Sequence, residues 1–482
     1  MIEINNFIKY KRSGVFMQKS HLKYLFNPQS IAIIGASSSS DKMGFRIVKN
    51  IVEKNFKGKL YLVNPKGGSV FNIPIFKSVD ELPVGIDLAI FVIPKSVITP
   101  AIKLCINKNT KFIMILTAGF KEIGFDGTKL EEEIRKLINQ SSTRIIGPNC
   151  AGLCNTSNNL HATFEIYPKK GNISFISQSG SICSAFSSNL SVREAGVSKY
   201  ISLGNKLNIN EVDLIKYLGN DPGTKCISLY LEDITNGRSL LQIVPKISLK
   251  KPIVVLKSGY TPEGAQATFS HTGAMSGKDQ VIDFAFRQMG IIRVNNLREL
   301  YDVSSAISVL GPLKGNKIAI ISDAGGPGVI ATDAISSLGL KLAKLSEKTK
   351  NILRSFLPSF ASVRNPIDMT FTREENLYYR CIEVLKDDEV DMILVTIPSH
   401  FDTKDELLSF LIEAKKKIKI PLMVAWLCAD EVEKQRRSLW KAGIPTFIDP
   451  QQASICIKHL VWYGEWLNKR TNTRIQYHKL PD

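Results

Sequence analysis

A histidine with glycines on both sides is the residue of this chain best suited to chemistry. His271 lies in the segment Ser-His-Thr-Gly-Ala (270–274), and the 482 residues include only six histidines. Because Gly264 and Gly277 flank the segment, we expect a loop that can bend and swing. An exposed imidazole on such a loop can receive a phosphoryl group at one site and deliver it at another. A structural histidine in a turn is the alternative.

A carboxylate follows an apolar run and is a candidate partner for this histidine. Glu232 comes directly after residues 226–231, which have the composition of a buried strand. In α/β proteins, sites form at the carboxyl ends of such strands. Glu232 could accept a hydrogen bond from one ring nitrogen of His271 and leave the other as the nucleophile. A solvent-facing strand end is the alternative.

Three turns of small residues each join a predicted strand to a predicted helix. They lie at 35–38, 177–181 and 322–328. A helix start exposes backbone N–H groups and a positive dipole end, which together can bind an anion. Any doubly wound domain needs one such turn for structural reasons. Three of them in one chain indicate several phosphate groups to hold.

The first turn does not fit an NAD site. The dinucleotide motif needs G-x-G-x-x-G and an acidic residue at the end of the second strand. Here Gly35 is followed by serines, and the second predicted strand ends in Asn64-Pro65-Lys66. A lysine at that point favours a phosphate over a ribose. Residues 311–317 also lack the spacing of a P-loop, so a phosphoryl group on His271 would leave for something outside this chain.

Short β-rich runs alternate with helical stretches, which predicts parallel sheets covered by helices. We expect an α/β fold of three doubly wound domains at 19–150, 151–312 and 316–465. The predicted strands of the three domains are, in order, 30–34, 59–63, 88–93, 112–116 and 144–146; 171–176, 199–203, 226–231 and 252–256; and 317–322, 392–396, 422–426 and 446–448.

Composition excludes some classes of protein. The net charge is +19, but the lysines are spread along the chain, so we expect no nucleic-acid partner. The eight cysteines lack zinc-site spacing, which predicts no metal site and reduced thiols in the cytoplasm. No apolar run reaches membrane-spanning length. Residues 1–16 do not resemble a signal peptide, and Met17 is a second candidate start.

Eight motifs in order identify a family resemblance. They are SIAIIGAS (30–37), NPK (64–66), LTAGFKE (116–122), IGPNCAG (146–152), SQSGS (177–181), LGNK (203–206), SHTGA (270–274) and RNPIDMT (364–370). Together they resemble the α-subunit type of ADP-forming acetate–CoA ligase, a nucleoside-diphosphate-forming acyl-CoA synthetase related to succinyl-CoA synthetase. The resemblance covers about residues 19–465. It implies a Rossmann-like CoA-binding domain followed by two flavodoxin-like domains, the second of them a ligase-CoA domain.

The resemblance implies the reaction acyl-CoA + ADP + phosphate ⇌ carboxylate + CoA + ATP, through an acyl phosphate and a phosphohistidine. It implies that His271 is phosphorylated and that Glu232 orients it. Coenzyme A is then a substrate of this chain. The implied CoA-site residues are Gly35, Ala36, Ser37, Lys66, Ile93, Pro94 and Asn149, and the implied phosphate-binding helix starts are Ser179, Gly180, Gly326, Pro327 and Gly328.

The resemblance also implies a partner. No stretch of the chain resembles an ATP-grasp module, so ADP, ATP and Mg would be bound mainly by a separate ATP-grasp β subunit, in a heterotetramer.

Two residues depart from the family pattern: Tyr260 stands where a basic residue is expected, and Glu211 where aspartate is usual. The motif at 364–370 has a structural or interdomain role by default, and the acid used is not readable from the sequence.

Three other classes of protein fit parts of this pattern. A CoA-binding or regulatory module without catalysis would not need both His271 and Glu232, which are present. An NAD-dependent oxidoreductase is disfavoured by the missing acidic residue on the second strand. Nucleic-acid binding rests on net charge alone.

Overall fold

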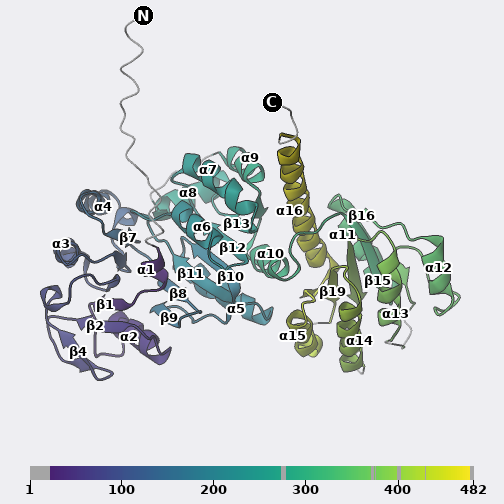
Figure 1. Ribbon diagram of the computed structural model, residues 1–482, viewed down its shortest axis with the longest axis horizontal. Coiled ribbons are helices and arrows are strands. Elements are labelled where there is room, and N and C mark those ends of the chain that lie inside the picture. Colours follow the sequence, from purple (N-terminus) through teal and green to yellow (C-terminus); the bar gives the residue numbers. More distant parts are fainter. Residues whose placement is uncertain are drawn as a thin grey trace, which may run out of the picture.

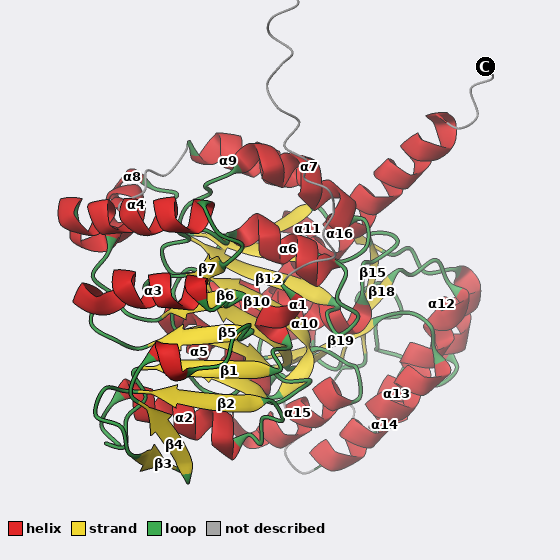
Figure 2. Cartoon of the chain, turned by 60° about the vertical axis from the view of Figure 1, so that its left-hand side comes forward, coloured by secondary structure: helices red, strands yellow, loops and turns green. Residues whose placement is uncertain are grey.

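Three sheets follow one another along the chain. The structure, a computed structural model, describes residues 22–272, 278–370, 374, 376–398, 403–428 and 430–477. Helices flank the strands of each sheet (Figures 1 and 2). We call the sheets with their helices the first, second and third units. The α/β class and the three-part organisation expected from the sequence are confirmed.

The first sheet has the strand order β3-β4-β2-β1-β5-β6-β7. Its central strand β1 (Ser30–Ile34) pairs in parallel with β2 and with β5. Successive side chains of a strand point to opposite faces, so Ile31 and Ile33 pack on the side of α2 while Ala32 and Ile34 pack with α3 and α4. The elements are α1 (Lys23–Phe26), α2 (Met43–Glu53), β2 (Lys59–Val63), β3 (Ser69–Val70), β4 (Ile73–Phe76), η1 (Val79–Glu81), β5 (Leu88–Phe91), η2 (Lys95–Val97), α3 (Ile98–Asn107), β6 (Phe112–Ile115), η3 (Lys121–Ile123), α4 (Phe125–Asn139) and β7 (Arg144–Ile146).

The second sheet has the order β14-β13-β12-β10-β11-β8-β9. The strands from β14 to β11 pair in parallel, as expected, and two antiparallel edge strands extend the sheet, because β8 pairs antiparallel with both β11 and β9. These two edge strands are joined by a four-residue turn, too short for the crossover that parallel pairing requires. The elements are β8 (Gly152–Asn155), β9 (Leu160–Thr163), β10 (Lys170–Ser177), α5 (Gly180–Val192), β11 (Val197–Ser202), α6 (Glu211–Gly219), β12 (Cys226–Leu231), α7 (Gly237–Ser248), β13 (Ile253–Lys257), α8 (Pro262–Thr272), α9 (Asp279–Met289), β14 (Ile291–Val294) and α10 (Leu297–Leu310).

The third sheet has the order β16-β15-β18-β19-β20, with β17 also paired to β15. Its long helix α16 lies beside α10, between the second and third units (Figure 1). The elements are β15 (Lys317–Ser322), α11 (Gly325–Ser337), β16 (Lys341–Leu342), α12 (Glu347–Arg354), β17 (Ile367–Asp368), α13 (Asn376–Val384), η4 (Leu385–Asp387), β18 (Met392–Ile397), α14 (Lys404–Lys417), β19 (Leu422–Trp426), η5 (Asp430–Val432), α15 (Glu433–Lys441), β20 (Thr446–Phe447) and α16 (Pro450–Tyr477).

The motif at 364–370 serves the third sheet. The side chain of Asn365 donates to the carbonyl oxygens of Ile318 and Ala343, at 2.8 and 3.0 Å, and accepts from the N–H of Ile320 at 2.9 Å. It therefore satisfies backbone groups on β15 and just beyond β16. The next residues form β17 and pair with the end of β15. The default structural role expected for this motif fits these contacts.

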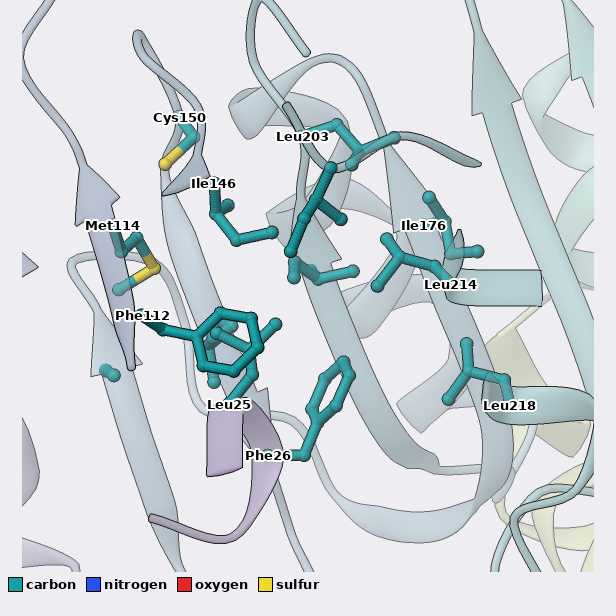
Figure 3. Close-up of a cluster of buried hydrophobic side chains, with 14 of the residues drawn as sticks. Leu25, Phe26, Phe112, Met114, Ile146, Cys150, Ile176, Leu203, Leu214 and Leu218 are labelled. Carbon is teal, nitrogen blue, oxygen red and sulfur yellow. The ribbon is translucent and has the colours of Figure 1, made fainter. Parts of the chain in front are cut away.

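The hydrophobic cores run across the boundaries between units. One cluster joins Leu25, Phe26, Phe112, Met114 and Ile146 of the first unit to buried residues of the second. Figure 3 shows the second-unit side chains opposite them, which include Ile176, Leu203, Leu214 and Leu218. A second cluster joins the other face of the second sheet to β15, α11 and α16 of the third unit. The second unit is thus buried on both sides by its neighbours.

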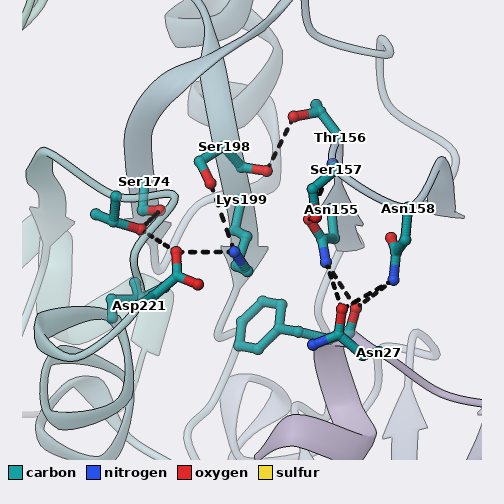
Figure 4. A network of polar contacts seen from close by, with 12 residues as sticks. Asn27, Asn155, Thr156, Ser157, Asn158, Ser174, Ser198, Lys199 and Asp221 are labelled. Atoms are coloured by element: carbon teal, nitrogen blue, oxygen red, sulfur yellow. Dashed lines mark hydrogen bonds and ion pairs between the residues drawn. The ribbon is translucent and has the colours of Figure 1, made fainter.

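Polar contacts reinforce the first of these boundaries. Asn155, at the end of β8, donates to the carbonyl oxygen of Phe26 at 2.9 Å and to Asn27 Oδ1 at 3.1 Å. Asn158 repeats the same pair of contacts. Nearby, the buried Lys199 ammonium lies 2.8 Å from the carboxylate of Asp221 (Figure 4). The short α1 is therefore held by the antiparallel edge of the second sheet.

No helix in the part of the chain that the structure describes combines the length and apolar character needed to cross a bilayer.

Candidate functional site

A cavity of about 1130 Å³ lies where the carboxyl edge of the first sheet meets the second unit. Its volume slightly exceeds the range of about 300–1,000 Å³ that is usual for small-molecule sites. All seven residues that the family resemblance implies for coenzyme A line it, and so does Gly180 at the start of α5. Residues far apart in sequence therefore meet around one space.

The turn between β1 and α2 forms one wall of the cavity. Gly35 has φ 98°, a conformation that side chains disfavour, and a Cβ there would lie 2.3 Å from the carbonyl oxygen of Val92. A Cβ on Gly44, in the first turn of α2, would lie 2.1 Å from the carbonyl oxygen of Gly35. The two glycines thus let the helix start pack directly on the turn, where its N–H groups face the cavity edge.

The turn after β2 brings a lysine to the same wall. The side chain of Asn64 donates to the carbonyl oxygen of Ala36 at 2.7 Å, and its Oδ1 accepts from the N–H of Lys66 at 3.0 Å. Lys66 lines the cavity, as does Lys42, the residue before α2. Lys42 was not among the residues expected from the sequence. Two ammonium groups and a helix start give this end of the cavity a positive character.

The turns after β5 and β7 form the base of the cavity. The hydroxyl of Thr117 donates to the carbonyl oxygen of Ile93 at 2.7 Å. The carbonyl oxygen of Thr117 accepts a hydrogen bond from the N–H of Asn149 at 3.0 Å. Ile93, Pro94 and Asn149 all line the cavity. Asn149 has φ 56° and follows a cis Gly147–Pro148 bond, in the connection between β7 of the first sheet and β8 of the second.

The second unit contributes the remaining wall. Ser177, at the end of β10, donates its hydroxyl to the carbonyl oxygen of Ser179 at 2.7 Å and accepts the Ser179 N–H at 3.1 Å. This compact turn aims the start of α5 at the cavity, which Gly180, Ser181 and Glu165 line. Ser179 caps the helix without a side-chain hydrogen bond, so the first N–H groups of α5 keep their capacity to bind an anion.

Gln178 fixes the segment that carries Glu232. Its Oε1 accepts from the backbone N–H groups of Glu232, at 2.6 Å, and Asp233, at 3.0 Å, and its Nε2 donates to Asp233 Oδ1. Glu232 is 6% exposed and follows β12. The solvent-facing alternative for Glu232 is therefore wrong. The SQSGS motif acts here through the glutamine, which the sequence analysis did not single out.

A buried ion cluster lies behind this segment. Lys206 Nζ is 2.5 Å from Asp233 Oδ1 and 3.2 Å from Glu211 Oε2, and the side chains of Lys206 and Glu211 have no exposed surface. Burial alone would raise the pKa of Asp233, but Lys206 and the Gln178 hydrogen bond outweigh it and hold that pKa below its usual value. Glu211, noted as a departure from the family pattern, is therefore an ion-pair partner of the LGNK lysine.

A second buried lysine lies beneath Glu232. Lys257, the last residue of β13, donates from Nζ to the carbonyl oxygen of Glu232 at 2.8 Å. Burial lowers the pKa of Lys257, partly offset by attraction to Asp233 and Asp279. β12 and β13 are parallel neighbours, with Leu231 paired to Lys257. The start of α8 and Glu232 therefore emerge at the same edge of the second sheet.

His271 lies in the last turn of α8. The sequence predicted a loop at 270–274; the chain is instead helical through Thr272, while residues 273–277 and the His271 side chain lie outside the described part. The run Pro-Glu-Gly-Ala-Gln-Ala (262–267), with proline at its first position, is compatible with a helix start. Helix α8 contacts η3 of the first unit, so the histidine segment lies at the boundary of the first and second units.

The LTAGFKE segment before α4 is also tied to the second unit. Glu122 accepts from the N–H of Gly119 at 2.6 Å and from Asn205 Nδ2 at 2.6 Å. Asn205 also donates to Glu131 Oε1 at 2.7 Å. The LGNK motif thus anchors η3 through its asparagine and the Glu232 segment through its lysine.

The third small-residue turn repeats the geometry of the second. Ser322 donates to the carbonyl oxygen of Ala324 at 2.7 Å and accepts its N–H at 3.3 Å, like Ser177 and Ser179. Gly326 and Pro327 lie in the first turn of α11, and a Cβ on Gly326 would meet nothing within 4 Å. Gly326, Pro327 and Gly328 are not among the residues that line the cavity, so a phosphate role for this turn stays a prediction.

The residues that the sequence reasoning missed share one property. Lys42, Gln178, Lys206 and Asp233 act through contacts with distant segments, and local pattern does not reveal such contacts. Three of them, Gln178, Lys206 and Asp233, lie in segments that the sequence analysis names: SQSGS, LGNK and the Glu232 segment.

Among the described residues, no group of His, Cys, Asp or Glu has the geometry to hold a metal ion.

Family models match most of the chain in three successive segments. A CoA binding domain matches residues 29–156, a succinyl-CoA ligase like flavodoxin domain matches 170–307, and a ligase-CoA domain matches 318–463. The order agrees with that of the three sheets.

Full-length relatives match as well. The chain is 39% identical over 446 residues to acetate–CoA ligase [ADP-forming] II subunit alpha of Pyrococcus furiosus, covering 91% of this chain and 97% of the relative. Acetate–CoA ligase [ADP-forming] I of Archaeoglobus fulgidus is 35% identical over 92% of this chain, which spans 64% of that relative. The dinucleotide forming acetyl-coenzyme A synthetase 1 of Ca. Korarchaeum cryptofilum, solved with phosphate and ADP, is 31% identical, with a TM-score of 0.87 over 94% of this chain and 98% of that one.

Proposed function

The chain belongs to the family of ADP-forming acetate–CoA ligases, as its α-subunit type, and from this premise we propose how its residues divide the work. The family consists of acid–thiol ligases. The proposed reaction is acyl-CoA + ADP + phosphate ⇌ carboxylate + CoA + ATP. The observation that carries it is the cavity in which the CoA-motif residues of the first unit meet the start of α5.

Coenzyme A binds along the first-unit wall. Lys42, Lys66 and the start of α2 attract its phosphates. Gly35 and Gly44 keep the backbone free of side chains where the pyrophosphate approaches. The thioester end then points toward Gly180 and Ser181, which line the same cavity from the second unit.

Phosphate binds at the start of α5 and attacks the thioester. A phosphate oxygen forms a bond to the acyl carbon, the C–S bond breaks, and CoA leaves with the electron pair and takes up a proton. The products are acyl phosphate and free CoA. The exposed N–H groups of α5 stabilise the charge on the phosphate throughout this step.

His271 then takes the phosphoryl group. One ring nitrogen of the neutral imidazole forms a bond to phosphorus, the bond from phosphorus to the acyl oxygen breaks, and the carboxylate leaves. Glu232, held by Gln178 and Lys257 through its backbone, orients the other ring nitrogen and balances the positive charge that develops. Gly326, Pro327 and Gly328 are proposed as a second helix start that holds the phosphoryl group.

The phosphoryl group is delivered outside this chain. We propose an ATP-grasp β subunit, in a heterotetramer, as the partner that binds ADP and Mg²⁺. The relatives named as alpha subunits imply a partner subunit.

A cytoplasmic location is also proposed, because all eight cysteines are buried free thiols, as expected in a reducing compartment.

Labelling tests the catalytic assignment. The purified chain, incubated with acetyl-CoA and radiolabelled phosphate and no nucleotide, should acquire an acid-labile, base-stable label that the His271→Ala variant lacks. Glu232→Gln should slow labelling by about 10²-fold, since a positioned carboxylate contributes on that scale. An unlabelled wild-type chain that still binds CoA would overturn the assignment in favour of a non-catalytic CoA-binding module.

A further inference from the structure

We propose that a second cavity, between the second and third units, is an effector site. It binds a planar aromatic ring that carries one negative charge, and the bound ligand slows phosphorylation of His271 by acting on Lys257 and Glu232. The site is separate from the CoA cavity, the space of about 1130 Å³ that the CoA-motif residues line. The inference rests on the proposed function, because the step that it regulates is the proposed phosphorylation.

The second cavity lies at the carboxyl ends of β13 and β14, since Lys257 and Val294, the last residues of these strands, line it. Its volume of about 890 Å³ is within the range usual for small-molecule sites. Within the described part of the chain, the two cavities share no lining residue. Two helices contribute most of the remaining lining: Asp279, Gln280, Asp283, Phe284 and Arg287 come from α9, and Ile455, Lys458, His459 and Trp462 come from α16.

Aromatic side chains of the lining indicate the shape of the ligand. Tyr260, Phe284 and Trp462 all line the cavity, and the side chains of Tyr260 and Phe284 are 57% and 70% exposed. Clustered exposed apolar side chains mark binding sites, and a planar ring can stack on aromatic side chains such as these. Tyr260 stands where the family pattern has a basic residue, so this chain places a ring where the pattern would place a cation.

The charges of the lining indicate the sign of the ligand. Arg293 lies 2.5 Å from Asp279, and Arg287 lies 2.8 Å from Asp283, so these four charges offset one another in pairs. Burial and the nearby Lys458 lower the pKa of His459 to about 4, so its imidazole is neutral at pH 7. An excess of one positive charge favours a monoanion over a cation. The charged residues of the lining are Lys257, Arg287, Arg293 and Lys458, against Asp279, Asp283 and Glu299.

Lys257 connects the second cavity to the segment of Glu232. Its side chain is 2% exposed, and its Nζ donates to the carbonyl oxygens of Glu232, at 2.8 Å, and of Ser258. In the second sheet, β12 lies between β13 and β10. Glu232, which follows β12, therefore lies between the end of β13 at the second cavity and the start of α5 at the CoA cavity.

A bound anion weakens the support of Glu232. Its negative group attracts the ammonium of Lys257 and competes with the Glu232 carbonyl oxygen for the N–H donors, because a charged acceptor forms the stronger hydrogen bond. Glu232 then loses one of the contacts that hold its backbone, while the contact with Gln178 stays. Since the proposed role of Glu232 is to orient His271, phosphorylation should slow by about fivefold or more, the lower end of usual allosteric coupling.

Benzenesulfonate tests the binding site, because a sulfonate cannot form the acyl phosphate of the reaction and so cannot act as a substrate. Calorimetric titration of the purified chain, with the CoA cavity saturated by CoA, should show one site per chain. Benzenesulfonamide keeps the ring without the charge, and methanesulfonate keeps the charge without the ring. Both should bind at least about fivefold more weakly than benzenesulfonate.

Two variants place this binding in the second cavity. Tyr260→Ala removes an exposed ring and should raise the Kd for benzenesulfonate by about fivefold. Lys458→Gln removes a charge of the lining and should raise the Kd more at low than at high ionic strength. The matched control is Lys416→Gln, which removes an exposed lysine of α14 and should leave the Kd unchanged.

Labelling of His271 with acetyl-CoA and radiolabelled phosphate tests the coupling. Saturating benzenesulfonate should slow the wild-type rate by about fivefold or more. In Lys257→Gln, which labels more slowly from the start, it should cause no further loss. Should Lys257→Gln not fold, Tyr260→Ala provides a second measurement, because at a concentration that half saturates the wild type it should keep most of its rate.

The outcomes distinguish the two proposals. A wild-type chain that binds CoA but not benzenesulfonate overturns the effector site, and so does binding that both Tyr260→Ala and Lys458→Gln leave unchanged. Binding with no effect on labelling overturns the coupling through Lys257. A wild-type chain that acquires no label even without benzenesulfonate overturns the proposed function, and calorimetry then still decides whether the second cavity binds the anion.

Discussion

At the scale of single residues, the buried charges around Glu232 do most to define the site. Lys206 forms ion pairs with both Asp233 and Glu211, and Gln178 and Lys257 hold the backbone of Glu232. The contacts of Lys206, Gln178 and Lys257 with the segment 232–233 are to its backbone and to the Asp233 carboxylate. These three are positioning residues, and their effect on catalysis passes through that segment.

Lys206→Met should be strongly destabilising. It would leave two buried carboxylates without their cation, a change that typically costs about 3–5 kcal/mol. Urea denaturation followed by circular dichroism measures it. The matched control is Lys350→Met, which breaks the surface pair Lys350–Glu347 and should cost less than about 1 kcal/mol. Equal effects of the two variants would contradict the importance of the buried cluster.

His161 should make the stability of the chain depend on pH. Burial lowers its pKa to about 4, while the unfolded chain titrates near 6.5. As the pH falls from 6.5 toward 4, the unfolded state gains a proton that the folded state does not bind, so stability is lost over this window, by at most about 3 kcal/mol. His161 Nε2 lies 2.9 Å from the carbonyl oxygen of Glu165. His161→Gln keeps a donor at this position and should lose less stability over the same range.

The comparison is the urea midpoint at pH 7 and at pH 4.5 for both proteins. Parallel changes in the wild type and in His161→Gln would show that other groups carry the pH dependence.

At the scale of elements, close packing of α2 on the turn after β1 shapes the CoA end of the cavity. Gly44→Ala should weaken CoA binding by about tenfold or more, because its Cβ would lie 2.1 Å from a backbone oxygen and the helix start must move. Overpacking of this kind also costs about 1–3 kcal/mol. Isothermal titration with CoA measures the first effect and thermal unfolding the second.

The control for this change is Gly237→Ala at the first turn of α7, where a Cβ would meet nothing within 4 Å. It should be neutral or slightly stabilising. Full CoA affinity in Gly44→Ala would contradict the packing argument.

Local pattern predicted the elements well where each is a continuous apolar run. The predicted strands 30–34, 59–63 and 226–231 coincide with β1, β2 and β12. The short strands β8 and β9 were missed, because Gly152–Asn155 and Leu160–Thr163 mix small, polar and apolar residues. The serine and glycines around His271 predict a loop, whereas the chain is helical through Thr272.

The candidate site was less predictable. A motif can indicate that Gly35 or Lys66 belongs to a binding turn, but not that Glu165 lies beside Gly180. Which distant residues come into contact depends on how the two sheets pack. The local sequence pattern carries no information about this packing. The family resemblance supplied the residues of known motifs only, so the contributions of Lys42, Gln178 and Glu165 became visible only in three dimensions.

At the scale of the whole molecule, aromatic contacts join the second and third units. Tyr463 of α16 donates its hydroxyl to the carbonyl oxygen of Ser248 at 2.6 Å and stacks on Trp466, whose ring lies against Gly290 at the end of α9. These contacts keep the third unit fixed on the face of the second unit opposite the first.

Trp466→Ala should loosen this attachment. Truncating a buried tryptophan typically costs about 3–5 kcal/mol, and here the loss falls on the contact between units. We expect faster limited proteolysis near the connection at 311–316, with CoA affinity unchanged. Phe360→Ala, at a side chain 73% exposed, is the control and should leave the cleavage rate unaltered. Unchanged cleavage in Trp466→Ala would contradict a stabilising role for this contact.

The hydrophobic core that crosses from the first unit into the second has a consequence for synthesis. The core includes Leu25 and Phe26 near its beginning and reaches Ile291 at its end. On the ribosome, the first sheet is complete at Ile146, but the partners of its inner face emerge over the next 145 residues. At about 5–20 residues per second, the part of that face that α1 and α2 do not cover waits about 7–30 s for its partners. We therefore expect the nascent first unit to expose apolar surface during that interval and to acquire its full stability only after the second unit has been made.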